Sequence, residues 1–223
     1  MKSIDFKEQI SEMLKKHGNV AKNINRREMI KLSVEKREAL VMECGALATW
    51  TAPESTGRSP KDTYMVKHPE SQHLIDWTSA NNIPMAPDTF NMLFEDAIKT
   101  LAESSKIYET DRVLGADSAY ALPVKTVTNK ALSSLFVDNM FRTVPNDIKK
   151  SIFAEKPFIL ISLPDCKVNN ERYEGRLRKN EKGEVSNLAV AMDFDRRVGI
   201  VYGSAYMGSM KKLIFTVMNY YLP

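Results

Sequence analysis

Hydrophobic residues recur at helical spacing in three stretches of the chain. Residues 3–16 carry one apolar stripe, and residues 87–104 carry another. We expect Asp88 to cap the second of these helices. A third helical pattern covers residues 126–141. Each stripe repeats every three or four residues, so we expect these helices to pack one face against a core.

Continuous apolar runs predict strands between and after these helices. The run FILISLP, which follows Pro157, is β-branched enough for a strand that is covered on both faces, and a strand is also expected at residues 107–114. Two further strands are expected at residues 186–194 and 197–202, separated by a short turn. Strands interspersed with helices predict an α/β fold with a mixed β-sheet flanked by helices.

Polar stretches indicate how the chain is divided. Residues 24–37 are mostly polar and predict a connector with a short helix. We therefore expect an N-terminal helix and connector over residues 1–38 and an α/β domain over residues 39–223. The charged run at 169–184 predicts a loop or an exposed hairpin.

The final helical pattern, residues 210–222, differs from the others because it is apolar on nearly every face. Such a helix suits burial between layers better than exposure at a chain end. We therefore expect a further domain, or a partner that docks on residues 210–221.

Composition narrows the class of protein. With 43% hydrophobic and 27% charged residues the chain is globular, and its longest apolar runs fall short of the roughly 20 residues that cross a bilayer. Its start lacks the apolar core of a signal peptide, so we expect a cytoplasmic protein without membrane contact. Cys44 and Cys166 are expected to be buried and inert, and a net charge of +4 does not favour nucleic-acid binding.

The first candidate for chemistry is the stretch STGRSPKD, residues 55–62. Gly57 and Pro60 favour a turn, yet Arg58 and Lys61 place two cations inside it. The plain alternative is that Arg58 pairs with Asp62 or Glu54. The other interpretation is that this turn presents Arg58 to an anionic ligand.

The second candidate is YGSAYMGSMKK, residues 202–212, where a strand leads into a glycine-containing loop and a helix. Exposed N–H groups at a helix N-terminus attract anions. Lys211 and Lys212 could simply be a solvated helix start. However, cations there oppose the helix dipole, which favours a compensating anion or metal.

Three blocks of this sequence resemble segments that occur in the same order in the ATP-dependent phosphoenolpyruvate carboxykinases. They are GALATWTAPESTGRSPKDTYMV, GADSAYALPVKTVTNKALSSLFVDNMF and YMGSMKKLIFTVMNYYLP, which together extend over most of residues 45–223. The resemblance implies the amino-terminal domain of that fold. It also implies a reaction of gluconeogenesis, in which oxaloacetate and ATP give phosphoenolpyruvate, CO2 and ADP with Mn²⁺ or Mg²⁺.

The resemblance also implies roles for individual residues. Arg58 would contact the substrate carboxylate, and Tyr206 would line the site of substrate and CO2. Lys212 would be a catalytic residue that binds the metal and neutralises the transferred phosphoryl group. A guanidinium matches a carboxylate in a bidentate manner, whereas a lysine can ligate a metal only as the neutral amine.

The sequence also departs from the family pattern. Met207 and Ser209 stand where a small residue and a glutamate are usual, and Ala121 and Lys125 replace two arginines. We expect Met207 to narrow the pocket and the missing carboxylate to leave a lysine without a partner.

A larger departure concerns ATP. The 223 residues contain no GxxxxGK[ST] phosphate loop, so we expect these residues to lack the nucleotide-binding domain and to be inactive alone, with no tight binding of ATP or metal. Two alternatives remain. The chain could be a stand-alone, non-catalytic anion-binding or regulatory module, or it could bind nucleic acid through the basic run at 172–182.

Overall fold

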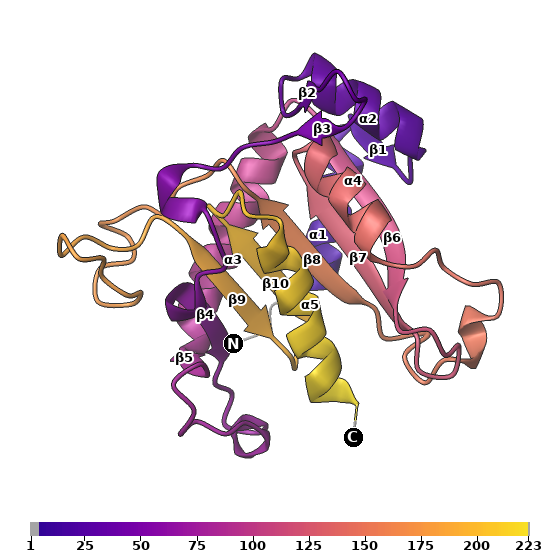
Figure 1. Ribbon diagram of the computed structural model, residues 1–223. Coiled ribbons are helices and arrows are strands. Elements are labelled where there is room, and N and C mark those ends of the chain that lie inside the picture. Colours follow the sequence, from indigo (N-terminus) through magenta and orange to yellow (C-terminus); the bar gives the residue numbers. More distant parts are fainter. Residues whose placement is uncertain (1–4, 223) are drawn as a thin grey trace. The chain divides into compact units, whose positions relative to one another are not determined.

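A computed structural model describes residues 5–222 of the chain, without the side chain of Glu54 (Figure 1). The chain divides into two compact units. The first contains Met1–Thr49 and Asp96–Leu160, and the second contains Trp50–Glu95 and Ile161–Pro223. The expected boundary near residue 38 stays a prediction.

The first unit combines a sheet with helices. Its elements are α1 (Phe6–His17), β1 (Val20–Lys22), α2 (Arg26–Glu35), β2 (Leu40–Val41), β3 (Leu47–Ala48), β6 (Ile107–Leu114), β7 (Leu122–Thr128), α4 (Ala131–Met140) and a short 3-10 turn at Ile148–Lys150. Strand β6 pairs in parallel with β1 and antiparallel with β7, while β2 and β3 form a separate hairpin. Helix α4 packs on β6, β7 and α2.

The second unit contains both candidate loops. Its elements are the 3-10 turns Pro53–Ser55, Pro60–Asp62 and Gln72–Leu74, the strands β4 (Thr63–Val66), β5 (Ile83–Met85), β9 (Ala189–Asp193) and β10 (Val198–Tyr202), and helix α5 (Gly208–Tyr221). The strand order is β10-β9-β4-β5, with β10 antiparallel to β9 and β4 parallel to both of its neighbours. Helix α5 lies across β9 and β10 (Figure 1).

Two elements contribute residues to both units. They are α3 (Pro87–Glu103) and β8 (Phe158–Leu163), and every residue of β8 is buried, as its continuous apolar sequence predicts. Each unit contains parallel and antiparallel pairs covered by helices. The prediction of a mixed α/β fold is therefore confirmed.

One expected helix start and one expected helix cap are wrong. The pattern at 126–141 is a strand up to Thr128, and its helix begins only at Ala131, because the β-branched Thr126, Val127 and Thr128 continue β7. Asp88 lies inside the first turn of α3. The carbonyl of Ala86 accepts the first helical hydrogen bonds, from the N–H groups of residues 89 and 90.

Helix α5 buries only one face. Its buried side chains include Leu213, Ile214, Val217 and Met218, whereas Lys211, Lys212, Phe215 and Asn219 are exposed. Within the described part of the chain one face of this helix is uncovered, so its burial by a further domain or a partner stays a prediction. The periodicity of three and four residues sets the buried face, since polar residues occupy the other one.

The prediction of two buried cysteines is also wrong. Cys44 is exposed in the turn between β2 and β3, and Cys166 is half-buried after β8. Among the described residues, no helix combines the length and the apolar composition needed to cross a bilayer.

Candidate functional site

A cavity of about 480 Å³ lies within the second unit, beside α5. Four segments line it. The early turn contributes Arg58, Ser59 and Pro60, the strands contribute Thr63, Met65, Val190 and Met192, a further turn contributes Asn81 and Asn82, and α5 contributes Ser209, Lys212, Leu213, Thr216 and Asn219. Met65, Val190 and Met192 are apolar, so most polar groups of the lining come from the turns and the helix.

Asp62, the last residue of the early turn (residues 55–62), anchors this turn to the rest of the second unit. This carboxylate is buried, and its two oxygens accept hydrogen bonds from Nε and Nη2 of Arg178, both at 2.9 Å. The carbonyl oxygen of Ser59 accepts hydrogen bonds from the N–H of Asp62 and from the hydroxyl of Thr63. The turn is therefore anchored through its end, and Arg58 remains exposed at the cavity.

The Asp62–Arg178 pair decides between the two interpretations of Arg58. Asp62 is paired with Arg178, and the hydrogen bonds that the Arg178 guanidinium donates to this carboxylate raise the pKa of Arg178. Among the side chains that the structure describes, Arg58 has no ion-pair or hydrogen-bond partner. The interpretation that Arg58 pairs with Asp62 is wrong, and Glu54 lies outside the described side chains.

The later loop is held by close packing and by hydroxyl groups. Gly203 has a φ of +79°, and a Cβ atom there would lie 2.5 Å from the carbonyl oxygen of Asn187. The buried hydroxyl of Ser204 is 3.3 Å from that of Ser55 and 3.1 Å from that of Ser209. These contacts attach the start of α5 to the 3-10 turn that precedes the early cationic turn.

The lining of the cavity is electropositive. It includes the side chains of Arg58 and Lys212 but no carboxylate among the described residues. Neither Lys211 nor Lys212 forms an ion pair with a described side chain. Two uncompensated cations in a concave site attract a small anion, and the asparagine and threonine groups can hydrogen-bond its remaining oxygens.

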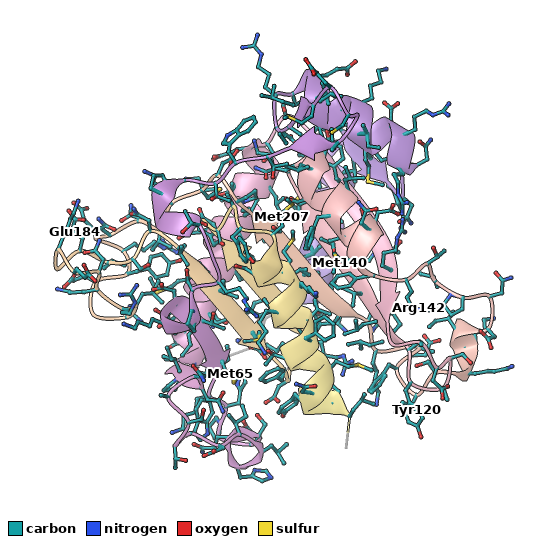
Figure 2. The ribbon with its side chains drawn as sticks, in the orientation of Figure 1. Met65, Tyr120, Met140, Arg142, Glu184 and Met207 are labelled. Carbon is teal, nitrogen blue, oxygen red and sulfur yellow. The ribbon has the colours of Figure 1, made fainter. Side chains whose placement is uncertain are left out.

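Tyr206 and Met207 are not among the residues that line the cavity. Both are half-buried, and the ring of Tyr206 lies against Gly208, where a Cβ would be 2.3 Å from its Cε1 atom. Met207 lies at the start of α5 (Figure 2). The structure thus brings Arg58 and Lys212 together in one cavity, without Tyr206, and Met207 does not narrow it.

Sequence reasoning missed several polar groups of the cavity. Thr216 and Asn219 follow Lys212 at helical spacing, so the periodicity of α5 would have placed all three on one face. Asn81 and Asn82 come from a turn before β5. Only the tertiary structure brings that turn to the cavity, because nothing in its local sequence points to α5.

The charged run at 169–184 is a loop with an isolated bridge between Lys179 and Val185, and Figure 2 labels Glu184 within it. Three of its cations form ion pairs within the chain. Arg172 pairs with Glu95 at 2.9 Å, Lys179 pairs with Glu174, and Arg178 pairs with Asp62. This pairing does not favour the nucleic-acid alternative, which requires cations free to contact phosphates.

A family model described as phosphoenolpyruvate carboxykinase matches residues 18–223 of this chain. The chain belongs to this family. It is 31% identical over 223 residues to the ATP-dependent phosphoenolpyruvate carboxykinase of Bacillus pumilus, covering the whole chain and 40% of that relative. The corresponding enzyme of Chelativorans is 34% identical over 211 residues, which cover 94% of the chain and 36% of the relative.

The enzyme of Thermus thermophilus is also similar, with 34% identity over 198 residues that cover 87% of the chain and 35% of the relative. The chain therefore spans about 40% or less of the length of these carboxykinases. It corresponds to their amino-terminal part.

The carboxykinase family uses ATP and a divalent metal ion. The cavity by itself does not fit such a metal, because its described lining contains no carboxylate or imidazole and a lysine binds metal only as the neutral amine. Lys212 can therefore supply at most one ligand. The sequence contains no phosphate loop for ATP either.

Proposed function

We propose that this chain is the substrate-binding part of a phosphoenolpyruvate carboxykinase and that its cavity binds oxaloacetate. A single observation carries the proposal: Arg58 and Lys212, far apart in the sequence, line one cavity without an acidic side chain. A dicarboxylate supplies the negative charge that these two cations lack. The complete enzyme would convert oxaloacetate and ATP to phosphoenolpyruvate, CO2 and ADP in gluconeogenesis.

Arg58 and Lys212 have different parts in this proposal. The planar guanidinium of Arg58 suits bidentate contact with one substrate carboxylate. As the ammonium, Lys212 would balance the charge of the transferred phosphoryl group. In the complete enzyme it would have to lose its proton to supply one ligand to Mn²⁺ or Mg²⁺, and the other metal ligands would come from outside this cavity. Tyr206 would lie near the substrate and CO2, although it is not among the residues that line the cavity.

The chain alone is proposed to be inactive. Phosphoryl transfer needs bound nucleotide and metal, which a phosphate loop and several further ligands normally hold, and these parts are not in the sequence. A carboxy-terminal nucleotide-binding domain is therefore the proposed partner. We also propose that the protein is cytoplasmic.

The substrate assignment can be tested with oxalate, a small dicarboxylate. Calorimetric titration of the chain with oxalate should show binding, and Arg58→Ala should weaken it by about ten- to hundredfold, because a hydrogen-bonded charge is lost. Arg58 is exposed, so its removal should leave the unfolding midpoint unchanged.

Lys61→Ala is the matched control, since Lys61 is an exposed cation of the same turn that does not line the cavity. It should change oxalate affinity by less than about threefold, as expected for a rim charge screened by salt. Equal losses in the two variants would mean that only general charge attracts the ligand, and the assignment of Arg58 would fail.

One observation favours a second function, that of a non-catalytic anion-binding or regulatory module. Ser209 lines the cavity at a position where the resemblance implies a glutamate, so the charge of the site differs from that of the family pattern. Such a module would bind the same anion but would not support phosphoryl transfer with any nucleotide-binding domain.

A further inference from the structure

A second cluster of ligating groups lies outside the cationic cavity. His68, Glu70 and Asp195 each offer one ligand atom, and these atoms all lie within 4.8 Å of one another. All three belong to the second unit, and none lines the cavity of Arg58 and Lys212. Two carboxylates and an imidazole at this spacing can close around a single ion.

The imidazole of His68 is oriented by a buried carboxylate. Its Nε2 atom is 3.0 Å from Oδ2 of Asp193, which is fully buried at the end of β9 and also accepts hydrogen bonds from Arg196. A carboxylate that accepts the Nε2–H leaves the Nδ1 lone pair free for a metal. Ligating histidines are commonly held in this way, with a carboxylate on the nitrogen opposite the metal.

The two carboxylates are available for a cation. Both Glu70 and Asp195 are exposed, and neither forms an ion pair with a described residue. Asp195 lies in the turn between β9 and β10, where its Oδ2 accepts a hydrogen bond from the hydroxyl of Ser71 at 2.8 Å. That contact fixes the turn next to the segment that carries His68 and Glu70.

We propose that His68, Glu70 and Asp195 bind a Zn²⁺ ion. A nitrogen ligand favours Zn²⁺ over Mg²⁺ and Ca²⁺, which prefer sites made entirely of oxygen. Three protein ligands leave a further position for water. The bound ion links the segment after β4 to the β9–β10 turn, so it stabilises the folded second unit by mass action.

The experiment uses the complete chain without a histidine tag, titrated with Zn²⁺ in a calorimeter. We expect one equivalent to bind and to raise the unfolding temperature, whereas Mg²⁺ should have little effect. His68→Ala and Glu70→Gln should each lower Zn²⁺ affinity by at least about tenfold, because losing even an outer partner of a metal ligand has effects of this size.

His73→Ala is the matched control. His73 is an exposed histidine of the same segment that is not in the cluster, so its removal should leave Zn²⁺ affinity within about twofold of the original chain. Glu70 is exposed, so Glu70→Gln should fold even if His68→Ala does not. Absence of saturable Zn²⁺ binding, or equal losses in Glu70→Gln and His73→Ala, would overturn the proposal.

Discussion

At the scale of single residues, the cationic cavity depends on a position where only glycine fits. Gly203 follows β10 with a φ of +79°, and a Cβ there would meet the carbonyl oxygens of Asn187 at 2.5 Å and Cys166 at 2.9 Å. Both neighbours are backbone atoms, which cannot move aside as a flexible side chain can. The path of the chain from β10 into α5 therefore requires this glycine.

We predict that Gly203→Ala lowers the free energy of unfolding by about 2–5 kcal/mol, the sum expected for a left-handed conformation and a forced contact. Gly57→Ala is the control, because Gly57 has open space around its Cα. The control should change stability by less than about 1 kcal/mol. Urea unfolding measures both, and similar values for the two variants would contradict the prediction.

At the scale of elements, an ion-pair cluster joins helices to the sheet of the first unit. Asp138 of α4 accepts a hydrogen bond from Nε of Arg26 on α2 at 2.8 Å and another from Arg112 on β6. Burial acts to raise the pKa of Asp138, but the hydrogen bonds from Arg112 and Arg26 outweigh it and hold this pKa below its usual value.

The sign of the pH effect follows from this shift. A carboxylate with a lowered folded-state pKa stabilises the fold above its unfolded pKa of about 3.9, and the contribution is lost as the pH falls through the folded value. We predict that Asp138→Asn lowers the free energy of unfolding by about 1–3 kcal/mol near pH 7 and by less near pH 3. Urea unfolding at both pH values tests this.

Glu35→Gln provides the comparison for Asp138→Asn. Glu35 forms an exposed pair with Lys31 at a spacing of four residues on α2, so its contribution should be below about 0.5 kcal/mol at either pH. If Asp138→Asn lost as much stability near pH 3 as near pH 7, the lowered pKa of Asp138 would not be the source of its contribution.

At the scale of the whole molecule, the chain covers about 40% or less of the carboxykinases that it resembles. We predict that the chain alone has no carboxykinase activity and that adding the separately produced carboxy-terminal domain of a relative restores measurable turnover. The reason is that nucleotide and most metal ligands must come from outside these 223 residues.

The informative control for this mixture is the Arg58→Ala chain, which should associate normally but give little turnover. Tight association of the unaltered chain without any activity would instead support the non-catalytic module. Oxalate titration of the same samples separates a failure of the substrate site from a failure of the two parts to assemble.

The spacing of hydrophobic residues predicted the secondary structure correctly where the residues of a segment favour one kind of element. The run FILISLP is a strand because a β-branched apolar sequence suits burial on both faces. For residues 126–141 the predicted helix began too early. The helical spacing was extended over Thr126 and Thr128, whose β-branched side chains belong to β7. Helix α3 starts at Pro87 as expected, but its cap was misassigned because Asp88 suits both a cap and a first turn.

The sequence by itself determined the family, the mixed α/β class and the two cationic loops, since motifs and periodicity are local properties of the chain. Only the tertiary structure showed that Arg58 and Lys212 share one cavity, that Asp62 is occupied by Arg178, and that Asn81 and Asn82 complete the lining. It alone also brought His68 and Glu70 to Asp195. The physical reason is that charge pairing and ligand geometry depend on distances of a few ångströms between segments that are remote in sequence.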